Sequence, residues 1–388
     1  MYISDYFLIA YKANSKSRKI LFHSVLLITT LVSLSFAAQA QIVNIPDVNF
    51  KTYLLGNTAI NTNLDTEIQV SEASSFTGTI NCISLSISDL TGIEAFTNLN
   101  VLYCYNNSIS SLNVTQNTAL TELRCHVNLL STLDVTQNPN LAALYCHANQ
   151  LVTLDVSQNT ALTILSCYEN QLASLDVTLN TALINLRCYS NLIPSLDVSN
   201  NVSLTNLECG NNSISSLDVS NNTALTFLGC GINTIANLDL SNNASLTDIY
   251  CYDNLLNSLN IANGNNLIIS TFWAYSNTNL TCIEVDDAVY SATNWTDIDA
   301  VSSFSENCGV GINEIYSMEV NIYPNPASSQ ITVDSEEMIE EITIFNMFGE
   351  LVQQENSNTF SVSTLSNGVY VMNIQTSNGI VRSRFIKE

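Results

Sequence analysis

Two Cys-His pairs are the residues of this sequence most suggestive of chemistry. Cys125 precedes His126, and Cys146 precedes His147; a thiol beside an imidazole is the arrangement that a nucleophilic catalyst uses. However, Tyr145 and His147 flank Cys146 in the alternation of a strand, where neighbouring residues point to opposite faces. Each thiol is therefore expected inside and each histidine outside. The sequence also has no P-loop, Rossmann glycine motif, HExxH or G-x-S-x-G, so we predict neither an enzyme nor a cofactor.

A repeated aspartate raises the possibility of calcium binding. Asp stands nine residues after six of the cysteines, at Asp134, Asp155, Asp176, Asp197, Asp218 and Asp239. Stacked carboxylates could hold Ca²⁺ between coils, or each could accept N–H groups of its own Asp-x-Ser/Thr turn. The glycine-rich repeats of calcium-binding solenoids are absent, which favours the turn. His126 and His147 lack a nearby carboxylate on their stripe, so we predict no metal site.

A fixed period governs the middle of the chain. Eight cysteines are 21 residues apart: Cys104, Cys125, Cys146, Cys167, Cys188, Cys209, Cys230 and Cys251. Around each one the sequence follows L-x-x-L-x-C-x-x-N-x-L-x-x-L, with Asn always three residues after the cysteine and Leu or Ile five after it. This frame resembles the leucine-rich repeat, with Cys at a strand position usually held by Leu. The entry coil around Cys82, with its 22-residue step, resembles the internalin type.

The repeat predicts a mainly β fold. A single coil cannot bury its own apolar side, so the coils must stack and share a core, with their strands in one parallel sheet. The repeated Asn is expected to bond backbone groups at the turn, and 21 residues leave room only for extended or 3₁₀ segments on the return path. Residues 272–275 and 281–285 are expected to form the last two strands.

The outward strand positions are the candidate binding site, on what we expect to be the concave face. They lie directly before or after each cysteine and form two stripes rich in Tyr, His and Arg: Tyr103, Tyr105, Arg124, His126, Tyr145, His147, Tyr168, Arg187, Tyr189, Tyr250 and Tyr252. Tyr and Arg are enriched at protein-binding hot spots, and aromatic rings also suit sugars. Alternatively, the rings only pack against one another. Gly210, Gly229 and Gly231 predict a flat or recessed zone within the stripes.

The ends of the chain are compositionally different from the repeats. Residues 1–40 have a basic start, an apolar run and Ala38-Gln39-Ala40, which predicts a signal peptide. The remainder has six Lys and Arg against 33 Asp and Glu, which excludes a nucleic-acid partner because phosphate contacts need basic residues. We assign residues 41–79 to an N-terminal cap, 80–285 to the repeats, 286–310 to a C-terminal cap and 311–320 to a linker. Cys282 and Cys308 lie outside the period and are expected to form a disulfide.

Residues 321–388 predict a small antiparallel β-sandwich, because segments of period-two alternation are separated by Gly and Asn turns. They open with Tyr-Pro-Asn-Pro at Tyr323, contain Gly-Glu-Leu-Val at Gly349 and Leu-x-x-Gly-Val-Tyr at Leu365, and end in a basic strand at Lys387. These motifs resemble the type A C-terminal sorting domain of the type IX secretion system. The resemblance implies export to the cell exterior, contact with the secretion machinery, removal of this domain and attachment to surface lipopolysaccharide.

Together these features predict a secreted, surface-displayed repeat protein that recognises a protein partner in adhesion. A glycan-binding module for polysaccharide capture and a purely structural solenoid are the alternatives.

Overall fold

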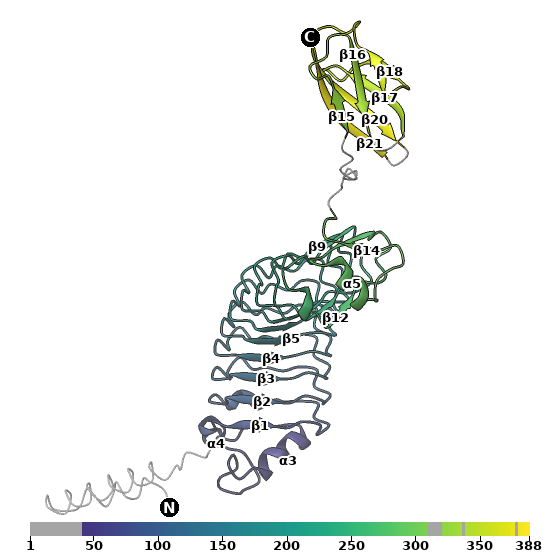
Figure 1. Cartoon of the computed structure of the whole chain (residues 1–388). Coiled ribbons are helices and arrows are strands. Elements are labelled where there is room, and N and C mark those ends of the chain that lie inside the picture. Colours follow the sequence, from purple (N-terminus) through teal and green to yellow (C-terminus); the bar gives the residue numbers. More distant parts are fainter. Residues whose placement is uncertain (1–40, 309–319, 336–337, 377–378) are drawn as a thin grey trace, which may run out of the picture. The chain divides into compact units, whose positions relative to one another are not determined.

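The computed structural model describes residues 41–308, 320–335, 338–376 and 379–388 (Figure 1). The expected signal peptide, 1–40, and most of the expected linker lie outside the described residues. The chain divides into two compact units, Met1–Asn307 and Cys308–Glu388, and each is described by itself. Within the described residues, no helix has the length and apolar character needed to cross a membrane.

The first unit is a solenoid with a ten-stranded parallel sheet along it (Figure 1). Each coil contributes one three-residue strand, and the strands pair in register so that equivalent positions of neighbouring coils are aligned. In sheet order they are β1 (Thr79–Asn81), β2 (Val101–Tyr103), β3 (Glu122–Arg124), β4 (Ala143–Tyr145), β5 (Ile164–Ser166), β6 (Asn185–Arg187), β7 (Asn206–Glu208), β8 (Phe227–Gly229), β10 (Asp248–Tyr250) and β12 (Thr271–Trp273). The predicted leucine-rich-repeat solenoid is confirmed.

The interior repeats from coil to coil. Leu144 and Cys146 are fully buried, while Tyr145 and His147 are half-buried on the other face, as the alternation predicts. Asn149 bonds two coils: its Nδ2 donates to the carbonyls of Cys125 and Cys146 at 3.1 and 3.0 Å, and its Oδ1 accepts the Leu130 N–H at 2.9 Å. These bonds satisfy backbone groups that the short strands leave unpaired, and buried amides require such partners.

A second asparagine ladder, which the sequence interpretation did not single out, runs along the return path. Its members are fully buried and stand 13 residues after the first seven of the eight regularly spaced cysteines: Asn117, Asn138, Asn159, Asn180, Asn201, Asn222 and Asn243. The Nδ2 of Asn159 donates to the carbonyls of Val135 and Asn138 at 2.8 Å each. This geometry fixes each turn to the turn before it.

The aspartate ladder forms local turns. Asp134 Oδ1 accepts the Thr136 N–H at 2.9 Å, and Asp155, Asp176, Asp197, Asp218 and Asp239 accept the equivalent N–H at 2.9–3.0 Å. Hydrogen bonds from the side chain and backbone of Thr136 lower the pKa of Asp134, and those of Thr178 do the same for Asp176. The expected Asx-turns are present.

The return path contains extended and 3₁₀ segments, as expected. The 3₁₀ helices are η1 (Ile93–Ala95) and η2 (Asn266–Ile268). In the last coils a second parallel sheet forms, of β9 (Asn237–Asp239), β11 (Ser258–Asn260), β13 (Cys282–Glu284) and β14 (Ser303–Ser305). The strand predicted at residues 281–285 is present as β13, but it is not the last one, because β14 follows it in the cap. β13 pairs with β11 and β14, since it continues on the return path the position that β9 and β11 hold seven to nine residues after Cys230 and Cys251.

Both ends of the core are covered. Helices α3 (Val48–Gly56) and α4 (Val70–Ser75) bury Phe50, Leu54 and Ala73 over the first coil. At the other end, α5 (Ala288–Asn294) and the buried Trp295 pack beside Phe272 and Phe304. Nine cysteines are free and buried, and the remaining two of the eleven, Cys282 and Cys308, are disulfide-bonded.

The second unit consists of two antiparallel sheets around a small core of its own, as predicted. The first sheet holds β15 (Asn321–Tyr323), β16 (Gln330–Asp334) and β19 (Thr359–Ser361). The second holds β18 (Leu351–Glu355), β17 (Ile339–Phe345), β20 (Gly368–Thr376) and β21 (Gly379–Lys387).

Candidate ligand-binding face

The structure places all eleven predicted binding residues on the outer face of the ten-stranded sheet. They lie in two columns that cross the strands. The first column contains the residues directly after each cysteine, Tyr105, His126, His147, Tyr168, Tyr189, Gly210, Gly231 and Tyr252, and is continued by Tyr275. The second column contains the residues directly before it, Tyr103, Arg124, Tyr145, Ser166, Arg187, Glu208, Gly229 and Tyr250, and is continued by Trp273.

The first column begins as a continuous stack of five rings. Ring centroids of Tyr105, His126, His147, Tyr168 and Tyr189 follow one another at 4.1–4.3 Å, with interplanar angles of 11–18°. Inside the stack every ring therefore covers the face of the next. Only ring edges and hydroxyl groups remain to meet a ligand, and the Nδ1 atoms of both histidines are buried.

The two histidines of the stack are neutral bases with low basicity. Burial, followed by the charge of Arg124, lowers the pKa of His126 to about 4. Burial, His126 and Arg187 lower that of His147 to about 4. No group of three or more His, Cys, Asp or Glu is arranged to hold a metal ion in the part of the chain that the structure describes.

The thiols beneath these histidines are inert. Burial raises the pKa of Cys125 to about 12 and that of Cys146 well above its ordinary value. A thiolate is the reactive form of cysteine, and each thiol lies on the opposite face of the sheet from its histidine. The Cys-His pairs therefore do not form nucleophile–base pairs.

The second column holds an arginine between two tyrosines. The guanidinium carbon of Arg124 lies 4.7 Å from the ring centroids of both Tyr103 and Tyr145. Its Nε also donates a 2.6 Å hydrogen bond to Glu122 Oε1. The outer face thus already contains one guanidinium that is satisfied by two rings and a carboxylate.

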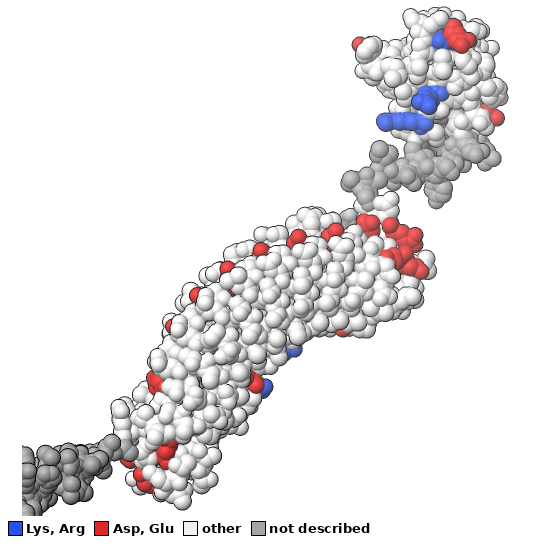
Figure 2. All heavy atoms as spheres, turned by 90° about the vertical axis from the view of Figure 1, so that its left-hand side faces the viewer, with Lys and Arg blue, Asp and Glu red and all other residues white. Residues whose placement is uncertain are grey.

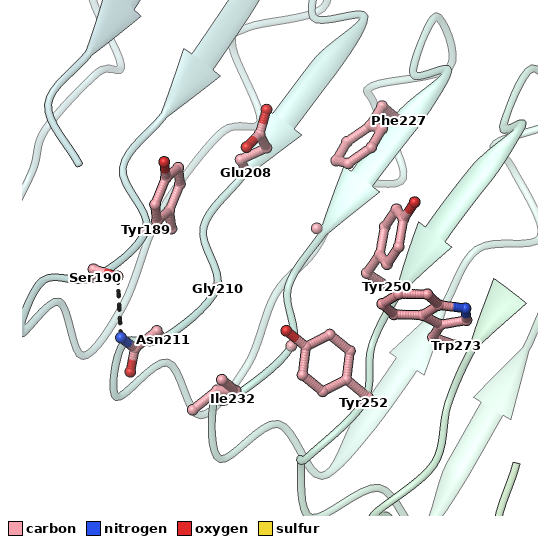
Figure 3. Close-up of a pocket in the computed structure, with 12 residues that line it drawn as sticks. Tyr189, Ser190, Glu208, Gly210, Asn211, Phe227, Ile232, Tyr250, Tyr252 and Trp273 are labelled. Atoms are coloured by element: carbon pink, nitrogen blue, oxygen red, sulfur yellow. Dashed lines mark hydrogen bonds between the residues drawn. The ribbon is translucent and has the colours of Figure 1, made fainter. Parts of the chain in front are cut away.

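Both columns are interrupted at the predicted glycines, and the face is hollowed there. The hollow has a volume of about 420 Å³ and is lined by Tyr189, Ser190, Glu208, Gly210, Asn211, Phe227, Gly229, Gly231, Ile232, Tyr250, Tyr252 and Trp273. Figure 3 shows Tyr189 and Glu208 on one side, Tyr250, Tyr252 and Trp273 on the other, and Gly210 between them. Of the eleven predicted residues, only Tyr189, Tyr250 and Tyr252 line it.

Glycine is required on the floor of this hollow. A Cβ on Gly210 would lie 2.8 Å from the carbonyl oxygen of Gly231, and a Cβ on Gly231 would lie 2.8 Å from Cε1 of Tyr252. The Tyr252 ring therefore leans over Gly231, and the ring-free interval of the first column lies over Gly210.

Sequence reasoning missed three aromatic residues of this region. Phe227 lies three residues before Cys230, at a third outward position that the two stripes did not include. Trp273 and Tyr275 flank Ala274, which takes the cysteine's place after a step of 23 residues from Cys251. A search that includes both outward residues of each three-residue strand, and that allows for the insertion before Ala274, would have found them.

Charge is unevenly distributed on the solenoid. Residues 41–308 contain 23 Asp and Glu but only three basic residues, Lys51, Arg124 and Arg187. Figure 2 shows a regularly spaced row of acidic side chains along the outer curve of the solenoid and basic atoms on its inner curve. The acidic row therefore lies away from the candidate face, which contains Arg124 and Arg187.

Several solved structures resemble this chain. An internalin of Listeria monocytogenes, InlJ, whose functional domain is described as including a cysteine ladder, is 23% identical over 90% of this chain and 100% of its own, with a TM-score of 0.42. The internalin InlF of the same organism is 21% identical over 70% of this chain and 99% of its own, with a TM-score of 0.35. A leucine-rich-repeat protein of Leptospira interrogans is 19% identical over 56% of this chain and 63% of its own, with a TM-score of 0.40. No curated protein shows a significant match.

The second unit matches a family model. Residues 321–388 match the secretion system C-terminal sorting domain, in agreement with the motifs that begin at Tyr323 and end at Lys387. Such a domain directs its cargo out of the cell and to the cell surface. With the repeats and coils described above, the chain is a leucine-rich-repeat solenoid that carries a type IX secretion sorting domain at residues 321–388 and is displayed at the cell surface.

Proposed function

We propose that the solenoid is a recognition or adhesion module that binds a protein partner through the outer face of the ten-stranded sheet. The observation that carries this proposal is the combination, on one face, of a long aromatic surface with a hollow of about 420 Å³. Tyrosine and arginine are the residue types on which protein interfaces most depend, above all where they surround a pocket. The role is binding without catalysis.

The ring geometry favours a protein over a glycan as the partner. A sugar stacks on the free face of an aromatic ring, but the inner faces of the stack from Tyr105 to Tyr189 are covered by neighbouring rings. Ring edges and hydroxyl groups remain, and these suit hydrogen bonds to a polypeptide. In a purely structural solenoid, the rings would only need to pack against one another. An interruption of both columns that leaves a hollow would then serve no purpose.

The test is capture of surface proteins by the purified full chain, compared with a variant in which Tyr145, Tyr168 and Tyr189 are replaced by Ala. The control replaces Gln158, Leu179 and Asn200, which are exposed in the same three coils on the return side. We expect only the tyrosine variant to lose capture. Treatment of the surface material with proteinase before the assay should abolish capture by the parent chain. Capture that survives proteinase but not glycosidase treatment would favour the glycan alternative. Equal capture by both variants would contradict the proposal.

We also propose that the sorting domain is removed after export, and that the processed chain contacts surface lipopolysaccharide. Each unit has its own core, so the solenoid does not need the second unit in order to fold. Deleting residues 321–388 should leave a folded solenoid that fails to reach the surface. A surface-exposed mature protein whose mass includes Glu388 would contradict removal.

A further inference from the structure

The interval over Gly210 is the one place in the described first column where a ring position is open between two tyrosines. Tyr189 ends the five-ring stack on one side. On the other side Tyr252 leans over Gly231 and stacks on Tyr275 at 5.0 Å. The open interval is therefore about one coil wide, or about 4.8 Å. A flat group placed there would continue the stack from Tyr189 to Tyr252 (Figure 3).

The walls of the hollow form an aromatic cage. Phe227 and Tyr250 lie 5.2 Å apart, Tyr250 and Trp273 lie 4.9 Å apart in an edge-on arrangement, and Tyr252 and Trp273 lie 6.1 Å apart, all measured between ring centroids. Several rings that converge on one small space attract an organic cation, because the face of each ring is negative.

A carboxylate with unused hydrogen-bonding capacity completes the cage. Arg187 Nε forms an ion pair with Glu208 Oε1 at 2.9 Å, but the Nε–H of Arg187 makes no hydrogen bond. Within the described residues, no hydrogen bond to the Glu208 carboxylate is formed. Glu122, in contrast, is both ion-paired with and hydrogen-bonded to Arg124. The two carboxylates are equally shielded, with 23% of each side chain exposed, yet only Glu122 accepts a hydrogen bond from its guanidinium partner.

The rim carries an apolar residue in a conformation that costs energy. Ile232 has a φ of +56° and is 40% exposed. A β-branched residue is rare in this region, which Asn or Gly adopts more easily; Asn211, the equivalent residue of the preceding coil, has a φ of +50°. Val127, which is also β-branched and exposed, has a φ of +53° at the equivalent position of another coil. The left-handed turn therefore belongs to the repeat, and Ile232 contributes only its exposed apolar side chain to the rim.

From these features we infer that the hollow binds the guanidinium group of an arginine side chain presented by the protein partner. A guanidinium is both planar and cationic, so it fits the interval over Gly210, the cage and Glu208 together. The Tyr103–Arg124–Tyr145 sandwich with Glu122 is an occupied example of the same chemistry on the same face. This inference rests on the proposed binding of a protein.

The test uses N-acetyl-L-argininamide as the probe and the fluorescence of the full chain as the readout. Trp273 is 37% exposed in the cage whereas Trp295 is buried in the cap, so a ligand in the hollow changes mainly the Trp273 emission. We expect saturable binding of the arginine probe. The uncharged N-acetyl-L-citrullinamide and the non-planar N-acetyl-L-lysinamide should each bind at least about fivefold more weakly. Equal binding of either compound would overturn the inference, as would binding of a methyl glycoside in place of the arginine probe.

Two glutamate variants provide the matched control. Glu208→Gln should weaken binding of the arginine probe at least about fivefold, whereas Glu122→Gln, the same change in the occupied sandwich, should leave it unchanged. Tyr252→Leu should also weaken it, and thermal unfolding checks that each variant is folded. Unchanged binding by Glu208→Gln would overturn the inference.

The protein capture assay separates this inference from the proposed function. If Glu208→Gln still captures the protein partner as well as the parent chain, the arginine site is wrong and the proposed function stands. If the parent chain captures no protein but binds the arginine probe as described, the proposed function fails and the cation site stands.

Discussion

The inward and outward faces of the ten-stranded sheet share one backbone but differ in how fully their side chains satisfy one another. Inside, each coil repeats the same leucine, cysteine and asparagine contacts, and the Asn149 side chain bonds its own coil to the preceding one. Outside, the rings of the first column stack on one another from Tyr105 to Tyr189, and the stack ends at Gly210. In a solenoid the repeated contacts therefore specify the fold, and the position where the outer repetition stops marks the candidate site.

The largest loss of stability should come from removing a buried asparagine that links neighbouring coils. Asn159→Ala removes one of the two hydrogen bonds to each of the buried carbonyls of Val135 and Asn138, which keep the backbone N–H groups of Asn138 and Leu141. Each lost bond costs about 0.5–1.5 kcal/mol, and the cavity left in the core adds to this. We expect the free energy of unfolding to fall by about 3 kcal/mol in denaturant titrations. Asn200→Ala is the control, because Asn200 makes an equivalent bond to the Thr178 carbonyl at the exposed surface. Similar losses in both variants would show that burial does not decide the effect.

The second prediction concerns the pH dependence of stability, which should come from the two histidines of the five-ring stack. The folded pKa values of His126 and His147 are lowered from 6.5 to about 4, so between these pH values the unfolded chain binds protons that the folded chain does not. Stability should therefore fall as the pH drops from about 6.5 to about 4, by about 1 kcal/mol per histidine after allowance for partial exposure. Thermal unfolding against pH measures it. A chain with both histidines replaced by Gln should lose this dependence; an unchanged slope would contradict the assignment.

The sequence was sufficient for features that recur. The cysteine period, the inward Asn and the alternation of Tyr145 with Cys146 predicted the solenoid, its sheet and the faces of its residues, because one residue type repeated at one position has one structural explanation. The period also located the hollow, since three glycines replace ring-bearing or charged residues there.

Features that depend on one conformation could not be predicted. The lean of Tyr252 over Gly231 and the missing hydrogen bond between Arg187 and Glu208 are set by side-chain geometry. Trp273 was hidden by the insertion that ends the period. The second sheet was not predicted either: β13 pairs with β11 and not with β12, because it stands at the return-path position that β9 and β11 hold in the two preceding coils.

A third prediction compares Tyr168, inside the five-ring stack, with Tyr252, at the edge of the hollow. Tyr168 stacks on two rings, at 4.1 and 4.3 Å, whereas Tyr252 stacks on Tyr275 at 5.0 Å and meets Trp273 edge-on at 6.1 Å. Each aromatic pair contributes about 0.5–1.5 kcal/mol beyond burial, and the two contacts of Tyr168 are the shorter ones. We therefore expect Tyr168→Ala to cost about 0.5 kcal/mol more in unfolding free energy than Tyr252→Ala, and Tyr252→Ala to cost more in binding. A larger stability loss at Tyr252 would mean that the gap is a structural element.

The smallest effect should come from the aspartate ladder, which lies on the exposed side of the solenoid. Asp176 accepts hydrogen bonds from the backbone and hydroxyl of Thr178, at 2.9 and 2.6 Å. These bonds are local, so Asp176→Ala should lower the Tm by only about 1–2 °C, and Asp176→Asn, which keeps an acceptor oxygen, by less. Because each carboxylate is satisfied by its own turn, EDTA should leave the Tm of the parent chain unchanged. A large fall in Tm with EDTA that Ca²⁺ reverses would mean that the ladder binds calcium between coils. The outer curve would then be a second functional surface, and repetition alone would no longer distinguish the structural residues of this solenoid from its functional ones.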